Sequence, residues 1–347
     1  MTYLGEAISV ARRAKAITQE DLADRAGVTQ AALSRYENDL REPGPEVLER
    51  LARSLGVTPE LLQRGRRIGG AMAVDAHMRR RATANVGTWR RLEARLNMYR
   101  LHTQHLMEEI NLRADQTIPL LDAIDIGPAG AARITRMQWR LPVGPVRDLT
   151  GWLEAAGCIV VEEDFATSRV DGLSQWIDNH PVILINARIP TDRKRLTMAH
   201  ELGHLVLHSE SFTEAPEQDA NQFAAEFLMP AEVIRPELRM LTLAKLQDLK
   251  RAWMVSMQAL IEQAHNLGVL DARDRTRFYK QFSARGWRKA EPLSDQLPAE
   301  HPKLTHEIGA ALYARGLSAH EIAQITGYAE PAAENPFQPK GPRLRVL

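Results

Sequence analysis

The sequence has a single cysteine, almost no net charge and no long apolar run. One cysteine, Cys158, cannot form an internal disulfide, so a disulfide-stapled fold is excluded. Its position in the apolar run GCIVVEE indicates a buried core residue. The formal net charge is +1, which excludes a global basic field for nucleic acid. Any DNA binding therefore has to be local.

No stretch approaches the ~20 consecutive apolar residues that a transmembrane helix needs. The first residues, MTYLGEAISVARRAKAITQEDLA, become amphipathic and charged at once, unlike the apolar core of a signal peptide. We therefore expect a cytoplasmic protein that does not associate with a membrane. With 44% hydrophobic and 26% charged residues in 347, the composition is that of two or three folded domains.

Residues 1–65 predict an all-α module of about five short helices. Thr18 and Thr29 are expected to cap the helices QEDLADRAG and QAALSRYENDL, and Gly27 interrupts the helical pattern between them. Apolar residues at helical spacing are expected to pack this pair together: Leu22, Ala23, Val28, Leu33 and Tyr36. The outward residues of the second helix are Gln30, Ala31, Ser34 and Arg35, with Thr29 at its start. Such side chains suit base edges and phosphates in a major groove.

The run ITQEDLADRAGVTQAALSRYENDLREPGPEVLERLARSLGV resembles the helix-turn-helix domains of the Xre and lambda-repressor class. The resemblance implies a double-stranded DNA operator as partner and a phosphate contact from Gln19 on the first helix. Few basic residues lie on this face, so one copy would bind modestly and a homodimer reading two half-sites would bind better. The alternative is a helical bundle kept only for protein contact.

The rest of the chain predicts an α+β fold that is predominantly helical. Residues 66–125 form a helical, locally basic linker region, and its densest part, HMRRRATANVGTWRRLEARLNMYR, indicates a solvated helix face. The Gly and Pro of DIGPAGAAR indicate a connection. Residues 126–235 mix helices with short strands in GCIVVEE and VDGLSQWIDNHPVILIN. Residues 236–328 predict a helical C-terminal domain, and the Pro-rich residues 329–347 a disordered tail.

The stretch TMAHELGHLVLH places His200 and His204 four residues apart around Glu201. On a helix, positions i and i+4 share a face, so both imidazoles can bind one ion. A catalytic zinc typically has three protein ligands and a water, and Glu201, displaced by about 100° around the helix, can reach that water. Such a site predicts peptide hydrolysis, with the ion activating the water and Glu201 moving its proton.

The third ligand is expected from the next helix, PEQDANQFAAEFLM, which ends before Pro230. Glu217 and Glu226 are nine residues apart and therefore on opposite faces, so only one can face the ion. Glu217 shares its face with the small residues Ala220, Asn221 and Ala224, which would let the two helices pack closely. We therefore predict Glu217 as the ligand and Asn221 as a residue that supports the ligands.

A third histidine, His208, continues the i+4 series. Three successive turns span about 12 Å, which is too far for one tetrahedral ion to collect all three imidazoles. We predict that His208 supports the site without binding the ion.

The segments RLTMAHELGHLVLH and EQDANQFAAEFLMP resemble the ImmA/IrrE zinc peptidases, and the likeness covers about residues 90–292. Leu196 and Met198 depart from the usual phenylalanine and leucine. The resemblance implies a zincin-like peptidase domain with a small sheet, one zinc ion and Glu217 as the third ligand. It also implies a protein substrate that is itself a helix-turn-helix repressor. Manganese or another divalent ion fits a His2Glu site as well.

The combined features predict a DNA-binding transcriptional regulator with zinc-dependent endopeptidase activity, active or latent, in a stress or mobile-element response. One alternative is a regulator whose metal domain is a sensor without catalytic activity. Another is an antitoxin-like module that only docks a partner. Glu201 favours the enzyme, because a purely structural zinc has no use for that carboxylate.

Overall fold

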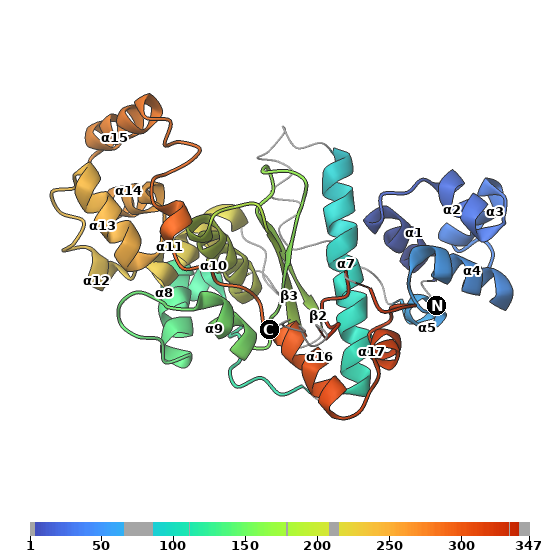
Figure 1. Ribbon diagram of the computed structural model, residues 1–347. Coiled ribbons are helices and arrows are strands. Elements are labelled where there is room, and N and C mark those ends of the chain that lie inside the picture. The colour runs from blue at the N-terminus through green and yellow to red at the C-terminus, as the bar shows by residue number, and fades with distance from the viewer. Residues whose placement is uncertain are drawn as a thin grey trace, which may run out of the picture.

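The computed structural model describes residues 4–65, 86–110, 112–177, 180–207, 215–332 and 334–339. The fold is α+β and predominantly helical, with one small sheet at its centre (Figure 1). A group of short N-terminal helices lies on one side of a long helix, and the sheet with the remaining helices lies on the other. Within the described ranges, no helix combines the length and apolar character that crossing a membrane requires.

The N-terminal module contains the five short helices that the sequence predicts. They are α1 (Leu4–Ala14), α2 (Gln19–Ala26), α3 (Gln30–Glu37), α4 (Pro45–Leu55) and α5 (Pro59–Gln63). The side chain of Thr18 accepts a hydrogen bond from the backbone N–H of Asp21, and the side chain of Thr29 accepts one from the backbone N–H of Ala32. Gly27 ends α2 in the left-handed region at φ 64°. These contacts confirm the predicted caps and the predicted break.

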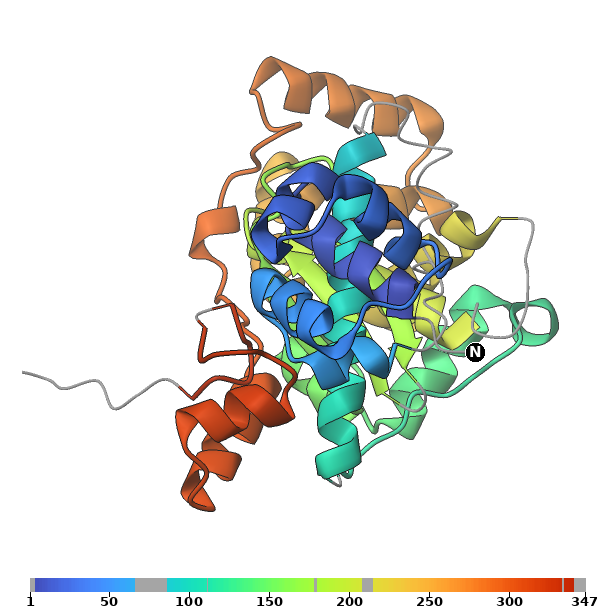
Figure 2. The ribbon, with the colours of Figure 1, turned by 90° about the vertical axis from the view of Figure 1, so that its right-hand side faces the viewer.

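The long helix α7 (Val86–Glu109) separates the N-terminal module from the sheet (Figure 2). Trp89, Leu92 and Leu96 of α7 pack in the same core as the strands. Ala94 and Met98 join the core of the N-terminal module. The expected solvated linker helix is therefore wrong for residues 86–109, because both flanks of α7 are covered. Of the rest of that prediction, residues 66–85 and 111 lie outside the described residues, and residues 112–122 contain no helix.

The sheet has three strands in the order β1-β3-β2. Strand β1 (Ile159–Glu163) runs parallel to β3 (His180–Asn186), and β2 (Gly172–Ile177) pairs antiparallel with β3. Alternate residues such as Val161 and Leu184 pack in the core shared with α7, while Val160 and Ile183 pack in the core on the opposite face. The sheet is thus covered on both faces, and β2 lies at one edge.

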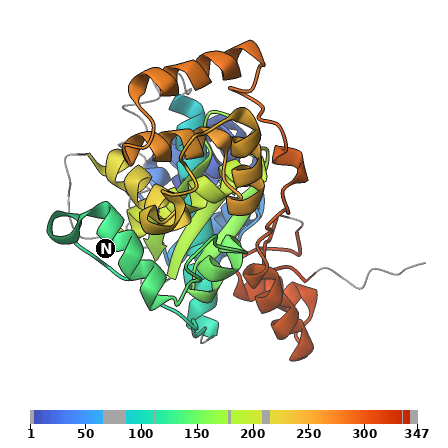
Figure 3. The ribbon, with the colours of Figure 1, turned by 90° about the vertical axis from the view of Figure 1, so that its left-hand side faces the viewer.

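The helices on the second face share one core that extends from Ile118 to Phe282 (Figure 3). They are α8 (Ala123–Gln138), α9 (Leu149–Ala155), α10 (Thr191–Leu207), α11 (Pro216–Leu228), α12 (Ala231–Ile234), α13 (Leu243–Trp253), α14 (Met257–Asn266) and α15 (Ala272–Ala284). The expected boundary after residue 235 falls inside this core, because Leu246 and Leu260 are both completely buried in it. The expected connection at DIGPAGAAR lies within α8, where Gly127 makes a kink at φ 67°.

The C-terminal segment returns to α7. It contains the 3-10 helix η1 (Ser294–Gln296), α16 (Leu304–Ala314) and α17 (Ala319–Ile325). Ile308 and Ile322 pack in the core of α7 and the sheet. The disordered tail expected from residue 329 is wrong for residues 329–332 and 334–339, because Phe337 is only 1% exposed and belongs to the same core. Apolar burial of one aromatic ring outweighs the Pro-rich composition here.

Candidate metal centre

The centre is built on α10 and α11, which pack closely against each other. A Cβ atom on Gly203 of α10 would lie 3.1 Å from the Cα of Ala220 and 3.2 Å from the Cβ of Phe223 on α11. A glycine at this position lets the two helices approach without that crowding. Ala220 and Ala224 are fully buried in the contact. The small residues of both helices thus position one helix face against the other.

His200, His204 and Glu217 meet at this contact. The Nε2 atoms of the two histidines are 3.1 Å apart. Glu217 Oε1 lies 3.2 Å from His204 Nε2, and Glu217 Oε2 lies 3.6 Å from His200 Nε2. A tetrahedral zinc with bonds of ~2.0–2.1 Å separates its ligand atoms by about 3.3–3.4 Å. Both the spacing and the donor set therefore fit one zinc ion.

Asn221 orients one of the histidines. Its Oδ1 lies 3.0 Å from His200 Nδ1, so the Nδ1–H of the neutral ring can donate to the amide oxygen. That tautomer presents the lone pair of Nε2 to a cation. The structure brings Asn221 to the position that the sequence predicts, whereas His208 lies outside the described residues.

Glu226, the other carboxylate considered from the sequence, takes part in a different contact. Its Oε1 is 3.1 Å from Arg133 on α8, and its Oε2 accepts from the backbone N–H of Ala231 at 3.1 Å. Glu217 and Glu226 thus lie on different sides of α11, as their spacing of nine residues predicts. Of the two, Glu217 is the one beside the histidines.

Glu201 is 1% exposed and lies between α10 and the sheet. The hydroxyl of Ser174 on β2, itself completely buried, donates to Glu201 Oε2 at 2.7 Å. The sequence analysis did not identify Ser174. The available signal was a hydroxyl at a strand position whose neighbours on that face, such as Ile183, are apolar. Strand β2 therefore fixes the carboxylate that would do the chemistry.

A groove of about 1020 Å³ is lined in part by α10 and α11, although His200, His204 and Glu217 are not among its lining residues. Its wall includes Thr197 of α10 and Asn221 of α11, and it continues along α14 to the segment 288–294. Because Asn221 both lines the groove and contacts His200, the groove adjoins the candidate centre. Its size and position suit an extended peptide segment.

The candidate DNA-reading residues lie together on the N-terminal module. Thr29, Gln30, Ala31 and Arg35 are exposed on α3 or at its start, and Ser34 is partly buried. Gln30 Nε2 donates to Gln19 Oε1 at 3.0 Å, which joins the second helix to the first. The structure thus brings the predicted phosphate contact against the start of the candidate recognition helix.

A buried ion pair below this surface escaped the sequence analysis. Arg12 of α1 donates to Glu37 through Nε at 2.6 Å and through Nη2 at 2.8 Å. The same carboxylate accepts from Gln19 Nε2 at 2.8 Å. Because Arg12 and Glu37 are 25 residues apart, no helical spacing links them, and only the fold reveals the pair.

Comparison with known families identifies both parts. Residues 8–62 match the helix-turn-helix family, and residues 153–265 match the IrrE N-terminal-like domain of the M78 peptidase family. No curated protein matches the chain. The first match covers α1 to α5, and the second runs from α9 into α14 and includes His200, His204 and Glu217. The chain therefore joins an Xre-like helix-turn-helix domain to an IrrE N-terminal-like peptidase domain.

Proposed function

We propose that this protein is a cytoplasmic, DNA-binding transcriptional regulator that acts as a zinc-dependent endopeptidase on a helix-turn-helix repressor. The observation that carries the proposal is the spacing of His200, His204 and Glu217, whose ligand atoms lie 3.1–3.6 Å apart. Glu201 lies on the same helix as the two histidines, α10, as a proton-transferring carboxylate would.

His200, His204 and Glu217 would hold the zinc ion, and manganese or another divalent ion would use the same donors. When bound, the ion would supply Lewis acidity: it would polarise a peptide carbonyl and lower the pKa of water, so that the water loses a proton more readily and becomes a better nucleophile. The protein has to supply proton transfer. Because Ser174 holds Oε2 of Glu201, we assign the transfer to Oε1, which takes the proton from the attacking water and delivers it to the leaving nitrogen.

The substrate class follows from the two domains in one chain. A peptidase attached to a DNA-binding module works at a high local concentration of whatever protein occupies the same operator. A helix-turn-helix repressor is such a protein. The roles of the exposed residues Gln30, Ala31 and Arg35 and of the partly buried Ser34 in base and phosphate contacts, with Thr29 and Gln19 beside them, belong to this proposal.

Co-expression with a candidate repressor tests the proposal. The repressor encoded nearest the gene is produced together with the wild type, with Glu201→Gln or with the control Glu232→Gln, which changes an exposed carboxylate on α12. Intact mass measures the length of the repressor, and the zinc content of the regulator is measured in parallel. We expect the wild type and the control to shorten the repressor, and Glu201→Gln to bind zinc and leave the repressor whole.

The same experiment separates the enzyme from a sensor without catalytic activity. A sensor would bind zinc and change DNA affinity on zinc removal, and every variant would leave the repressor whole. Equal shortening by the wild type and Glu201→Gln would contradict the assigned role of Glu201.

A further inference from the structure

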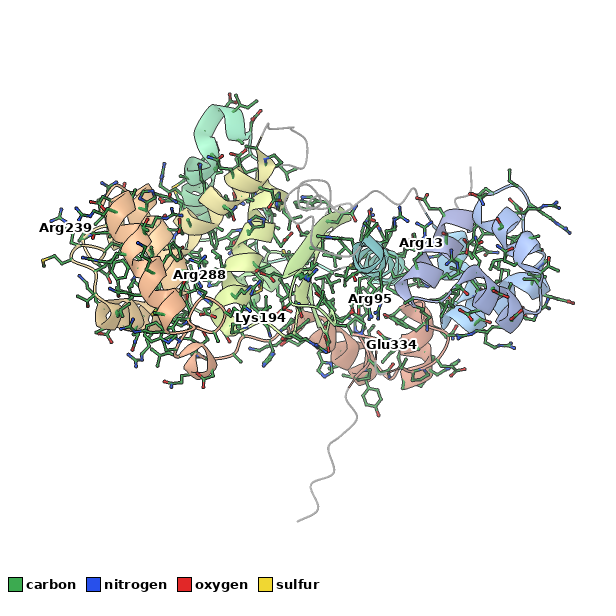
Figure 4. All side chains as sticks on the ribbon, turned by 90° about the horizontal axis from the view of Figure 1, so that it is seen from above. Arg13, Arg95, Lys194, Arg239, Arg288 and Glu334 are labelled. Atoms are coloured by element: carbon green, nitrogen blue, oxygen red, sulfur yellow. The ribbon has the colours of Figure 1, made fainter. Side chains whose placement is uncertain are left out.

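A second hollow, of about 320 Å³, lies at the junction of the N-terminal module with α7. Four segments that are distant in the sequence meet there: α1, the turn at Gly56 and Val57, the middle of α7, and the C-terminal segment at Tyr328. Val57 and Tyr328 form an isolated antiparallel bridge, and Thr58 N–H donates to the Gly327 carbonyl at 3.0 Å. In Figure 4, Arg95 and Glu334 lie at this junction, with Arg13 close by.

The interior of the hollow is apolar. Leu55, Val57, Met98 and Tyr328 line it and are at most 8% exposed. His102 stacks on the ring of Tyr328 at 3.9 Å and pairs through Nδ1 with the Thr326 carbonyl at 2.7 Å. Burial lowers the pKa of His102 to about 3, so its ring is neutral at physiological pH. The inner wall of the hollow is therefore uncharged and can pack against an apolar part of a ligand.

The rest of the lining is cationic, with Lys15, Arg25, Arg91 and Arg95 against one carboxylate, Glu334. Arg95 is neutralised by Glu163, at 2.7 Å. Lys15 and Glu334 are 3.6 Å apart with side chains 37% and 62% exposed, and such exposed pairs are weak.

Two of these cations, Arg25 and Arg91, have only longer-range carboxylate neighbours among the described residues: Asp21 for Arg25 and Glu163 for Arg91. Within the described ranges, no acidic group lies within ion-pair distance of Arg25 or Arg91. The buried Nε of Arg91 also finds no hydrogen-bond acceptor among the described residues. A buried donor that lacks an acceptor costs free energy, and an anion would recover it through a charge-assisted hydrogen bond.

We propose that this hollow binds a small organic anion, with an apolar body against Val57 and Met98 and a phosphate or carboxylate group at Arg91 and Arg25. The apolar wall favours an organic anion over a simple inorganic ion, and the volume suits a small-molecule ligand. Because the ligand touches α1, the Gly56 turn and α7 together, its binding favours the arrangement in which the DNA-binding module is docked on α7. The site is separate from the metal centre.

Titration of the full chain with 8-anilinonaphthalene-1-sulfonate tests the proposal, since this aromatic anion fluoresces in apolar surroundings. Arg91→Gln removes the partly buried cation whose Nε lacks an acceptor, and Met98→Trp fills the hollow. The control Arg251→Gln removes a cation that is 52% exposed on α13. Unfolding temperatures are measured for every variant, so that binding is compared only among folded proteins. We expect one saturable site that is weakened at least 10-fold by Arg91→Gln and by Met98→Trp, and unchanged by the control.

Competition identifies the class of anion. Adenosine monophosphate and octanoate are added separately to the probe complex, and the better competitor shows whether the site prefers a nucleoside phosphate or an aliphatic carboxylate. The proposal is overturned if no saturable site exists, if both variants bind as the wild type does, or if neither anion competes.

Discussion

The hydroxyl of Ser174 on β2 donates a 2.7 Å hydrogen bond to Oε2 of Glu201 on α10. Both groups are buried, at 0% and 1% exposure, so water does not compete for the carboxylate oxygen. An edge strand thus holds the carboxylate that lies next to the candidate ligand His200 in the chain. This contact links the small sheet to the proposed chemistry.

Ser174→Ala should lower peptidase activity and leave zinc content unchanged. Loss of the hydroxyl leaves Oε2 of Glu201 without this donor and frees the side chain to rotate, which we expect to lower kcat/KM about 10-fold. Steady-state cleavage of the repressor measures the effect. Ser174→Thr retains a hydroxyl and should recover most of the activity. Wild-type kinetics in Ser174→Ala would show that the contact is only structural.

Gly203→Ala should weaken the metal centre through packing alone. The added Cβ would lie 3.1 Å from Ala220 and 3.2 Å from Phe223, so these neighbours on α11 have to shift by a few tenths of an ångström. Overpacking of this kind costs about 1–3 kcal/mol, more than the ~1 kcal/mol that alanine gains in a helix. Chemical denaturation and zinc titration should both detect the change. Gly144→Ala is the control, because nothing lies within 4 Å of its Cβ.

Arg35→Ala should weaken DNA binding without affecting cleavage. Arg35 is exposed on α3 beside Gln30 and Ala31, on the face that we assign to the operator. Loss of one phosphate or base contact should cost about 1–3 kcal/mol and, for a phosphate, lower the salt dependence by about one counterion. Fluorescence anisotropy on an operator duplex at several salt concentrations measures both. The control Arg315→Ala changes an exposed arginine outside this face. If Arg35→Ala binds the operator as tightly as the control does, this face of α3 does not contact DNA.

Acid should destabilise the protein through His102. Burial lowers its pKa from 6.5 to about 3. Between these two values the ring is protonated in the unfolded chain and neutral in the folded protein. The stabilisation is complete above pH 6.5 and is lost as the pH falls toward 3, by about 2 kcal/mol between pH 6.5 and 5. Urea unfolding of the wild type and of His102→Gln at several pH values measures this loss. The unfolding free energy of His102→Gln should fall less steeply with decreasing pH than that of the wild type. Equal slopes for the two proteins would show that His102 does not cause the loss of stability in acid.

The sequence predicts most of the local structure because its signals are local. Thr18 and Thr29 cap their helices through contacts three residues away, and the spacing of His200 and His204 follows from one helical turn. Helical geometry lets only one of Glu217 and Glu226 face the ion, the small residues on the face of Glu217 favour that one, and the structure places Glu217 beside the histidines.

Contacts between distant segments were beyond the sequence. Ser174 is 27 residues from Glu201, and Arg12 is 25 residues from Glu37, so neither pair follows a helix or strand period. The basic composition of α7 hid its role, because its arginines lie on the flanks of an apolar core that includes Trp89. Phe337 likewise gains its burial from a tertiary core that composition does not reveal.

Zinc binding by the full chain tests the central claim most directly. Metal content by mass spectrometry and zinc affinity by competition with a chelator are measured for the wild type, His204→Ala, Glu217→Gln and the control Glu232→Gln. The account predicts about one zinc per chain in the wild type and in the control. It also predicts affinity lowered at least 100-fold when His204 or Glu217 is changed, because each supplies one of three protein ligands. Zinc bound equally well by Glu217→Gln, or no zinc in the wild type, would contradict it.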